Sequence, residues 1–432
     1  MITRTHISQL TPEIGKTTAI VGFVHAIRNQ GKIAFLRIRD KFGSVQVVVL
    51  GDNKSAFSVL EDLSLESVVK ITGLVKGDAP TPEKLEIEAA EIEVLSHAAP
   101  ELPIPVASEK GSLDVDITNR FDWRWLDLRN PDKAKIFDVW TTFEKGFRDE
   151  LLNKQGFTQL YAPSLMNTPS ESGSEVFEVK YFEKKAYLAQ SPQFYKQLAM
   201  AAGMERVFMV GPVFRAEPSF TSRHMTQFTG WDFEMSYIDS HHDVMDMEER
   251  ALVAGFKALR EDLLKDLDVP QAPFPRLTLS EIKSKLTDVG ITSDKVGDLS
   301  PEEERGIGKL VKEESGSDFV WVTDYPANTR AFYHMRHEDN PELTKGFDLL
   351  YKGIEVTTGA QREHRIEVLE KQAKEKGMPL DSLKDYLNFF RFGCPPHGGV
   401  GIGPDRIIMK IMDLSSVKEA AFLPRDVKRL TP

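Results

Sequence analysis

The sequence has 432 residues, of which 41% are hydrophobic, and a formal net charge of -11 at pH 7. This length and composition supply more than one domain and exclude a surface coated in positive charge, although a local basic face stays compatible with RNA binding. The single Cys394 excludes an intramolecular disulfide, and no apolar run approaches the roughly 18 residues of a membrane span, so we expect a globular cytoplasmic protein without a membrane partner.

Residues 1–100 predict a small β-barrel. Short segments rich in β-branched residues follow one another without a long helix, and turn signals lie at residues 29–31 and 41–43. Five such strands are typical of the OB-fold, which binds single-stranded nucleic acid through a basic groove and aromatic side chains. Phe35 lies between basic residues, with Gln46 on the next strand. It is therefore either a core side chain or a platform for an unstacked base.

A hinge is expected at residues 101–120, because prolines are frequent there and periodicity is weak. The remaining residues, 121–432, form the second predicted domain. Its first helix has apolar residues at helical spacing and ends at Gly156. A strand follows, with the sequence FTQLYAPSL, and is closed by Pro163.

The run from Phe214 to Met235, FRAEPSFTSRHMTQFTGWDFEM, predicts a hairpin. Arg215 and Glu217 share one face of an extended segment, a polar loop begins at Pro218, and a second strand covers roughly residues 226–237. Guanidinium groups bind phosphate oxygens well because their donors form a planar, permanently charged fork. The hairpin is either a charged surface element or the floor of a nucleotide site.

The C-terminal part predicts a mixed, mainly antiparallel sheet flanked by helices, so the fold class is α+β. Asp348 and Glu355 are seven residues apart, which places them on opposite faces of a continuous strand; a turn or bulge at Gly353 would bring them together. The glycines of GGVGIGPDR lack the spacing of a dinucleotide fingerprint. Residues 240–320 are charged and helical, and we assign them no catalytic role.

In chain order, these segments resemble the three motifs of class II aminoacyl-tRNA synthetases. Motif 1 is similar to the first helix and strand, motif 2 to the hairpin, and motif 3 to GGVGIGPDR. The runs SPQFYKQ and IEVTTGAQREH and the terminal PRDVKRLTP resemble the aspartyl family in its compact archaeal and eukaryotic form. The resemblance implies an anticodon-binding barrel, a homodimer built through motif 1, and aspartyl-tRNA synthetase activity, in which L-aspartate is activated with Mg²⁺ and ATP and transferred to tRNA-Asp.

The resemblance also implies residue roles. Arg215 and Arg406 would be the catalytic contacts to the α- and γ-phosphates. The rest of the ATP site would comprise Glu217, Arg223, His224, Phe228 and Glu355. Aspartate would be bound by Ser170, Glu171, Gln193, Lys196, Asp232, Thr358 and Arg362. Mg²⁺ would be held by Asp348, Glu355 and Thr358, the last standing where the family usually has serine. The anticodon contacts would be His25, Arg28, Phe35 and Gln46.

Three alternatives to this function stay open. An asparaginyl-tRNA synthetase shares the barrel and the three motifs, but the pairing of Lys196 with Arg362 and the C-terminal sequence count against it. A synthetase-like asparagine synthetase would lack the barrel, and a silent RNA-binding paralogue would have lost motif residues. The sequence leaves undecided whether tRNA-Asn is aspartylated as well as tRNA-Asp.

Overall fold

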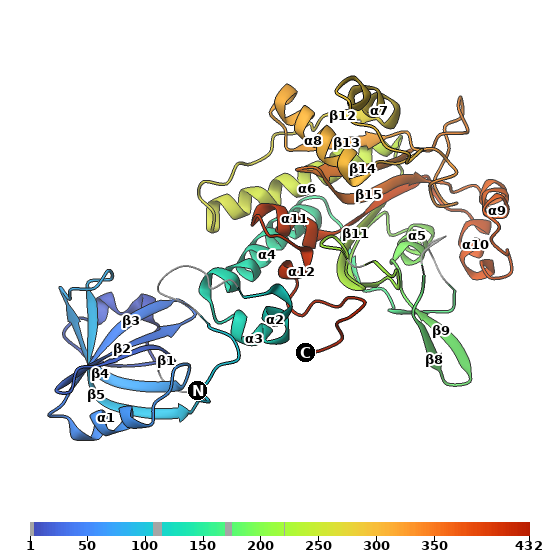
Figure 1. Ribbon diagram of the computed structural model, residues 1–432. Helices are drawn as coiled ribbons and strands as arrows, with labels where there is room; N and C mark the ends of the chain where they lie inside the picture. The colour runs from blue at the N-terminus through green and yellow to red at the C-terminus, as the bar shows by residue number, and fades with distance from the viewer. Residues whose placement is uncertain (1–3, 107–114, 169–174, 220) are drawn as a thin grey trace. The chain divides into compact units, whose positions relative to one another are not determined.

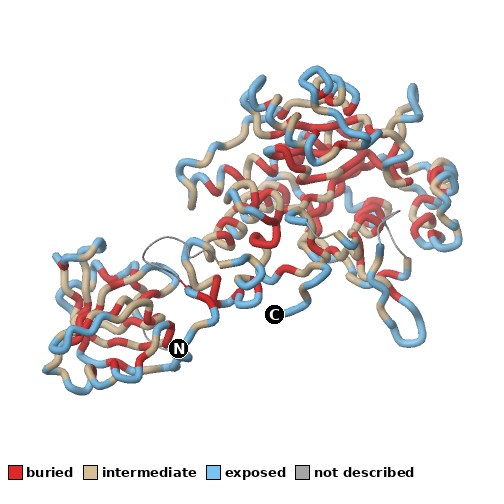
Figure 2. The backbone as a smooth tube through the Cα atoms, viewed as in Figure 1, coloured by how far each residue is buried: buried red, intermediate tan, exposed pale blue. Residues whose placement is uncertain are grey.

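The computed structural model describes residues 4–106, 115–168, 175–219 and 221–432. The chain divides into two compact units, Met1–Lys133 and Ala134–Pro432. Figure 1 shows the smaller unit in blue to teal and the larger one in teal through green to red. Buried residues, red in Figure 2, lie in the strands of both units and also in several helices of the larger one.

The smaller unit is a closed five-stranded barrel in the order β1-β2-β3-β5-β4. Its elements are β1 (Thr17–Asn29), β2 (Ile33–Asp40), β3 (Gly43–Leu50), α1 (Lys54–Ser58), β4 (Val68–Gly77) and β5 (Leu85–Ser96). Buried residues alternate along the strands, as in Ala34, Leu36 and Ile38 of β2, so that one face fills the barrel and the other meets solvent. The predicted barrel is therefore confirmed. Two short helices, α2 (Ile117–Asp122) and α3 (Arg124–Asp127), belong to the same unit.

The larger unit is built on an eight-stranded sheet in the order β12-β13-β14-β15-β16-β11-β10-β6. The strands are β6 (Thr158–Leu160), β10 (Arg206–Phe214), β11 (Gln227–Ser236), β12 (Arg276–Thr278), β13 (Phe319–Thr323), β14 (Gly346–Tyr351), β15 (Ile354–Arg362) and β16 (His397–Ile402). Only β12 with β13 and β6 with β10 pair in parallel among these described strands. The sheet is thus mixed and mainly antiparallel, as predicted. A separate small sheet contains β7 (Leu165–Met166), β8 (Glu178–Tyr181) and β9 (Lys184–Leu188).

Helices flank the large sheet (Figure 1). They are α4 (Pro131–Asp149), α5 (Gln193–Ala201), α6 (His241–Asp262), α7 (Leu279–Asp288), α8 (Pro301–Ser315), α9 (Ile366–Glu375), α10 (Lys384–Arg391), α11 (Pro404–Ile411) and α12 (Val417–Ala420). The apolar stripe of α4 includes Phe143 and Phe147, whose rings pack against Trp231 of β11. The strand expected after α4 is shorter than FTQLYAPSL, because only Thr158–Leu160 pair with β10.

The single cysteine of the sequence, Cys394, lies between α10 and β16. Cys394 is half-buried, and burial raises the pKa of its thiol to about 12. The thiol is therefore protonated at neutral pH, which suits a structural residue. Within the described residues, no helix is long and apolar enough to cross a membrane.

Candidate active site

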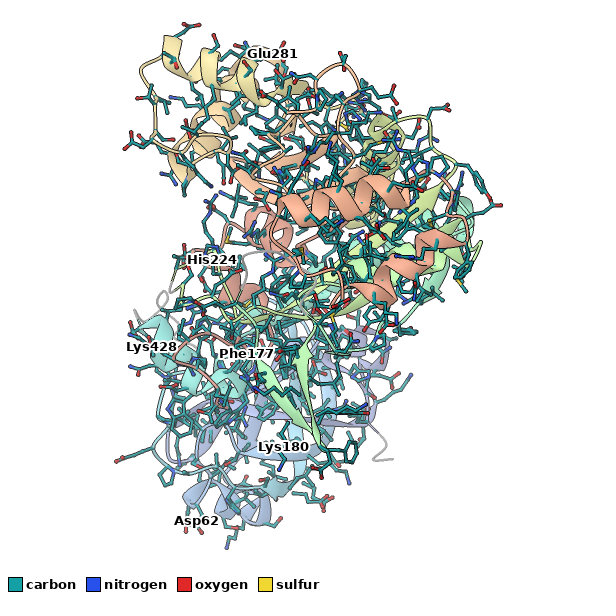
Figure 3. All side chains as sticks on the ribbon, turned by 90° about the vertical axis from the view of Figure 1, so that its right-hand side faces the viewer. Asp62, Phe177, Lys180, His224, Glu281 and Lys428 are labelled. Carbon is teal, nitrogen blue, oxygen red and sulfur yellow. The ribbon has the colours of Figure 1, made fainter. Side chains whose placement is uncertain are left out.

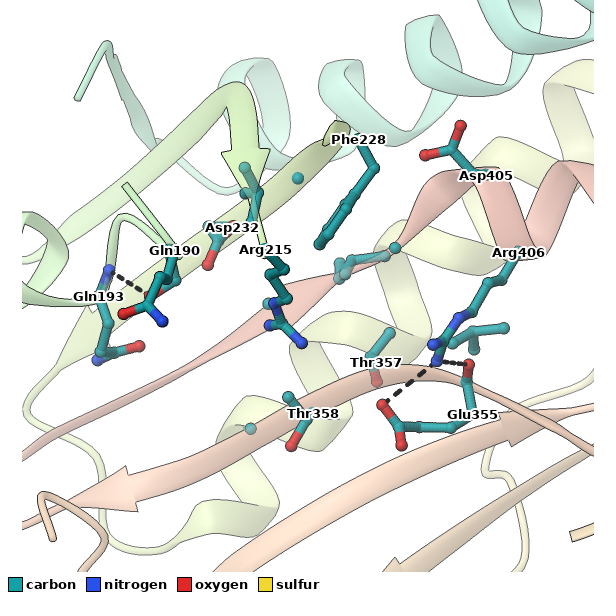
Figure 4. A pocket seen from close by; sticks show the side chains of 18 of the residues that line it. Gln190, Gln193, Arg215, Phe228, Asp232, Glu355, Thr357, Thr358, Asp405 and Arg406 are labelled. Atoms are coloured by element: carbon teal, nitrogen blue, oxygen red, sulfur yellow. Dashed lines mark hydrogen bonds and ion pairs between the residues drawn. The ribbon is translucent and has the colours of Figure 1, made fainter. Parts of the chain in front are cut away.

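A cavity of about 340 Å³ opens in the larger unit and is lined by residues of β11, β15, β16 and α11 (Figure 4). The structure gathers most of the predicted site residues there. The lining includes Gln193, Arg215, Glu217, Arg223, His224, Phe228, Asp232, Glu355, Thr358, Arg362 and Arg406. Lys196 is buried and pairs with Asp232 of the lining, and Asp348 is buried and stands opposite the lining residue Thr358 in the strand register. Ser170 and Glu171 lie outside the described residues.

The predicted hairpin forms one wall of the cavity. β10 and β11 pair from Arg206 opposite Met235 to Phe214 opposite Gln227, and the backbone N–H of Arg215 extends the ladder by donating to Thr226 O at 2.9 Å. Arg215 thus stands at the hairpin's end, where its guanidinium carbon lies 5.5 Å from the centroid of the Phe228 ring. A planar cation therefore lies beside an aromatic ring that projects into the cavity (Figure 4).

The hairpin loop carries Arg223 and His224, and the latter is labelled in Figure 3. Thr221 Oγ1 lies 2.6 Å from Nδ1 of His224. Burial lowers the pKa of His224, and the positive charge of nearby Arg406 lowers it further, so the imidazole is neutral at pH 7. Arg223 is therefore the permanent cation of this loop, and it forms an ion pair with Glu304 of α8.

A carboxylate pair occupies the wall made by β14 and β15. The two strands form a hairpin whose turn residues, Lys352 and Gly353, have φ of 47° and 72°, and a register shift follows at Leu349/Leu350. The predicted turn at Gly353 is thus present, and it places Asp348 and Glu355 on the same face of the hairpin. Asp348 stands opposite Thr358 in the register.

Glu355 has an unusual electrostatic setting. Burial and the charge of Asp348 raise the pKa of Glu355 to about 7, although 39% of its side chain is exposed; the exposed part faces the cavity. Arg406, in the first turn of α11, donates from Nη1 to the Glu355 backbone oxygen at 2.7 Å and lies 3.5 Å from the carboxylate (Figure 4). One side of Glu355 therefore faces a cation and the other a second carboxylate.

A buried four-charge cluster lies beside the opposite wall. Lys196 Nζ is 2.8 Å from Asp232 Oδ2 and 3.4 Å from Glu234 Oε2. Arg362 Nε donates to Glu234 Oε1 at 2.9 Å, and its Nη2 donates to Gly399 O at 2.8 Å. Two cations thus balance two carboxylates in a region almost closed to water.

The two carboxylates of this cluster differ. Burial opposes ionisation of Glu234, but Arg362 and Lys196 outweigh it and hold the pKa of Glu234 below its ordinary value. For Asp232, burial raises the pKa, and the Lys196 charge offsets only part of the effect. Glu234 is therefore the more firmly ionised member, because it contacts both cations.

Glycines of β16 make room for this cluster. Gly399 and Gly401 stand opposite Glu234 and Asp232 in the register of β11 with β16. A Cβ at residue 399 would collide with Glu234 Oε2 and with the backbone oxygen of Phe233. Glycine at every second position of β16 thus leaves room for the carboxylate side chains of the neighbouring strand β11.

The predicted anticodon residues lie on the barrel, in the smaller unit. Arg28 stands opposite Phe35 between β1 and β2, and Arg37 stands opposite Gln46 between β2 and β3. Since Phe35 and Arg37 are two residues apart, these side chains share the outer face of three adjacent strands. Phe35 is half-buried, whereas its neighbours Ala34 and Leu36 fill the core.

The fourth predicted anticodon residue, His25, differs in setting. The pairing of β1 with β2 shifts between Val24 and Ala26, so His25 stands at a β-bulge. Its Nδ1 lies 3.0 Å from Nη1 of Arg39, whose guanidinium is held by two bonds to the buried Glu66 at 2.8 and 2.9 Å. His25 is therefore placed by contacts within the barrel.

Sequence reasoning missed several residues around the cavity. Arg330 donates to Asp348 at 3.0 and 2.5 Å and to Thr358 Oγ1 at 3.2 Å, and its guanidinium carbon lies 3.5 Å from the Tyr325 ring centroid. The period-two spacing of Asp232 and Glu234 in β11 contained the signal for a shared role. Other residues that it did not assign are Gln190, Ser191, His334, Glu304 and Asp405.

The fit of a divalent cation rests on Asp348, Glu355 and Thr358. Within the parts of the chain that the structure describes, no group of three or more His, Cys, Asp or Glu side chains is arranged to hold a metal. Mg²⁺, however, commonly takes only one or two protein carboxylates and completes its shell with water and substrate phosphates. Asp348 and Glu355 fit such an ion, because burial and then the charge of Asp348 raise the pKa of Glu355, and a bound cation would offset both effects.

Comparison with known proteins assigns the chain to a family. Residues 116–427 match the model of class II tRNA synthetases of the D, K and N group, and residues 18–95 match an OB-fold nucleic acid binding domain. An aspartate–tRNA(Asp/Asn) ligase from Aeropyrum pernix is 43% identical, with 97% of this chain and 96% of the relative covered. The chain belongs to the aspartate–tRNA ligase family. Its enzyme class is therefore that of the aminoacyl-tRNA ligases.

Other relatives refine this picture. An aspartate–tRNA(Asp) ligase from Pyrococcus abyssi is 38% identical, with 99% of this chain and 100% of the relative covered. The structure of an asparaginyl-tRNA synthetase from Pyrococcus horikoshii complexed with asparaginyl-adenylate superposes with a TM-score of 0.90, at 31% identity and 100% coverage of both chains. The fold is thus shared by aspartate and asparagine enzymes, whereas the sequence is more similar to the aspartate ligases.

Proposed function

We propose that the cavity binds ATP at its Arg406 and Glu355 end and L-aspartate at its Lys196 and Arg362 end, and that the enzyme joins aspartate to the 3′ end of tRNA-Asp. The observation that carries this assignment is the arrangement of charges. Arginines and a carboxylate pair lie at one end of a single cavity, and a buried cluster of two cations and two carboxylates lies beside the other.

Activation consists of in-line attack by a carboxylate oxygen of aspartate on the α-phosphorus of ATP, with pyrophosphate as the leaving group. No general base is needed, so the protein acts by positioning and by stabilising negative charge. Arg215 contacts the α-phosphate, and Arg406 with Arg223 and His224 contacts the outer phosphates. Phe228 stacks on the adenine, and Glu217, which also lines the cavity, lies near the ATP and its metal.

Asp348, Glu355 and the Thr358 hydroxyl would hold Mg²⁺ against the phosphates. A bound Mg²⁺ supplies charge neutralisation of the triphosphate. Arg330 positions Asp348 and Thr358, to which it donates at 3.0 and 3.2 Å. The raised pKa of Glu355, about 7, makes cation binding and proton release linked events at this carboxylate.

Aspartate is selected by its side-chain carboxylate, which Lys196 and Arg362 receive. Asp232 faces the substrate ammonium, Gln193 holds the backbone end, and Thr358 completes the pocket. The family resemblance gives Ser170 and Glu171 a role in binding aspartate as well, and both lie outside the described residues. While Asp232 faces the substrate ammonium it pairs less fully with Lys196, so an amide in place of the substrate carboxylate would leave buried positive charge without its partner. Sites of this polar kind discriminate by as much as ~10⁴ to 10⁵. Glu234 pairs with both cations and holds them in place while the pocket is empty.

The barrel reads the anticodon through the outer face of β1, β2 and β3. Phe35 stacks on an unpaired base, Gln46 hydrogen-bonds it, and Arg28 contacts the backbone nearby. His25 stands at the bulge of β1. In this proposal it influences the choice between tRNA-Asp and tRNA-Asn.

Charging of purified tRNA-Asp and tRNA-Asn transcripts with labelled aspartate, and with labelled asparagine as control, tests this function. Aspartate on tRNA-Asp is the expected result. Aspartate on both tRNAs would place the chain with the relatives named for both. The second candidate, an asparaginyl enzyme, is favoured by the structural likeness at a TM-score of 0.90; transfer of asparagine alone would establish it and refute our assignment.

A homodimer in the cytoplasm completes the proposal. The segment resembling motif 1 exposes Tyr161 and Leu165, with 77% and 42% of their surface accessible, which suits an interface between two copies. Light scattering coupled to gel filtration should give twice the monomer mass. A monomer at micromolar concentration would contradict the dimer without affecting the proposed chemistry.

A further inference from the structure

Glu304 stands at the phosphate end of the cavity, although it belongs to a helical segment without an assigned role. It lies in the first turn of α8, whose N-cap Ser300 accepts from Glu303 N. The Glu304 side chain is only 12% exposed, and its Oε2 forms an ion pair with Nη2 of Arg223. The same nitrogen lies 3.5 Å from Gly353 O, in the turn of the β14–β15 hairpin.

The negative charge of Glu304 acts on other ionisable groups at this end of the cavity. Burial and then the charge of Asp348 raise the pKa of Glu355, and Arg406 lowers it. The charge of Glu304 raises it further. Cations also lie close together here. Burial lowers the pKa of Lys410, and the positive charge of nearby Arg223 lowers it further. A triphosphate that enters this end of the cavity would therefore find several cations, of which Arg223 is already paired with Glu304.

We propose that Glu304 is an anionic competitor for the outer phosphates of ATP, which occupies Arg223 in the empty site and is displaced when ATP binds. This inference rests on the proposed ATP site. Two anions compete for one guanidinium, and the donor nitrogen that Glu304 uses is shared with a backbone oxygen. The carboxylate also repels a triphosphate directly, so both effects act in the same direction.

The test is the affinity for ATP and for AMP, measured by calorimetry at saturating Mg²⁺ on the full-length protein. Glu304→Gln should tighten ATP binding about three- to fivefold, the upper range expected when one ion pair near the surface no longer has to be broken. AMP binding should not change, because AMP lacks outer phosphates. Glu302→Gln is the matched control, since it removes the same charge from the same turn at an exposed position.

Weaker or unchanged ATP binding in Glu304→Gln would overturn the proposal, since Glu304 would then position Arg223 or support the metal. An equal change for AMP would also overturn it. When both proteins also carry Arg223→Gln, Glu304→Gln should no longer tighten ATP binding. If it still does, Glu304 does not act by competing for Arg223, and the proposal is refuted. Aspartate-dependent pyrophosphate exchange by the unaltered protein, run in parallel, separates failure of the proposed function from failure of this inference.

Discussion

Replacing Glu234 with glutamine should destabilise the larger unit, because it leaves two buried cations with one carboxylate. Glu234 lies 2.9 Å from Arg362 Nε and 3.4 Å from Lys196 Nζ. At an effective dielectric constant of ~20, these separations correspond to attractions of about 6 and about 5 kcal/mol. Desolvation of the ions offsets much of this, and removing one partner of a buried ion pair costs ~3–5 kcal/mol. Glutamine keeps the shape and some hydrogen bonds, so we expect a loss of about 3 kcal/mol.

Urea unfolding followed by tryptophan fluorescence measures this loss, since the buried Trp231 and Trp321 belong to the larger unit. Glu313→Gln provides the control, because Glu313 forms a 3.8 Å pair with Lys309 in which both side chains are more than half exposed. That control should change stability by less than ~0.5 kcal/mol. A loss below ~1 kcal/mol for Glu234→Gln would refute the reasoning.

The same variant has a distinctive dependence on pH. Because the pKa of Glu234 is lowered in the folded state, its stabilisation is present above the ordinary glutamate pKa and is lost as pH falls through the folded value. The difference between the variant and the unaltered protein should therefore stay constant from pH 8 to pH 5 and narrow only below about pH 4. A difference that varies near pH 7 would show that Glu234 is not the firmly ionised member of the cluster.

Three further outcomes are expected. Because protons compete for Glu355, whose pKa is about 7, the Mg²⁺ concentration that half-saturates pyrophosphate exchange should rise below pH 7, by up to about tenfold per pH unit; a flat profile would exclude Glu355 as a ligand. Phe35→Ala should weaken tRNA-Asp binding by about 1–3 kcal/mol and leave pyrophosphate exchange unchanged; loss of both activities would contradict a role confined to the anticodon. Gly399→Ala should abolish aspartate activation, because its Cβ would collide with Glu234; full activity would show that the carboxylate can move aside.

Local patterns predicted the elements of the site better than they predicted its contacts. The β10–β11 hairpin was predicted, and the register confirms it. However, β10 ends at Phe214, so Arg215 and Glu217, whose period-two spacing suggested the first strand, lie beyond its end. A turn or a bulge around Gly353 was also predicted, since carboxylates seven residues apart lie on opposite faces of a continuous strand, and the structure has the turn. The strand after α4 was predicted too long, because pairing with β10 ends it after Leu160, and sequence pattern does not contain that limit.

Contacts between distant residues were the part that sequence could not supply. Lys196 and Glu234 come from α5 and β11, and their pairing depends on how that helix packs on the sheet. Glu304 is one of three consecutive glutamates in the first turn of α8, a position that suits any acidic residue through the helix dipole. Only the tertiary fold distinguishes it from Glu302, by placing it against Arg223.

The single cysteine offers a practical route to watching this enzyme at work. With a pKa of about 12, the Cys394 thiol is ionised in only about one molecule in 10⁵ at pH 7, and maleimide dyes react with the thiolate. A second cysteine placed on an exposed barrel residue such as Phe42 would therefore react far faster, without removal of the native one. A fluorophore attached there would report the arrival of tRNA at the barrel, while pyrophosphate release reports chemistry in the other unit.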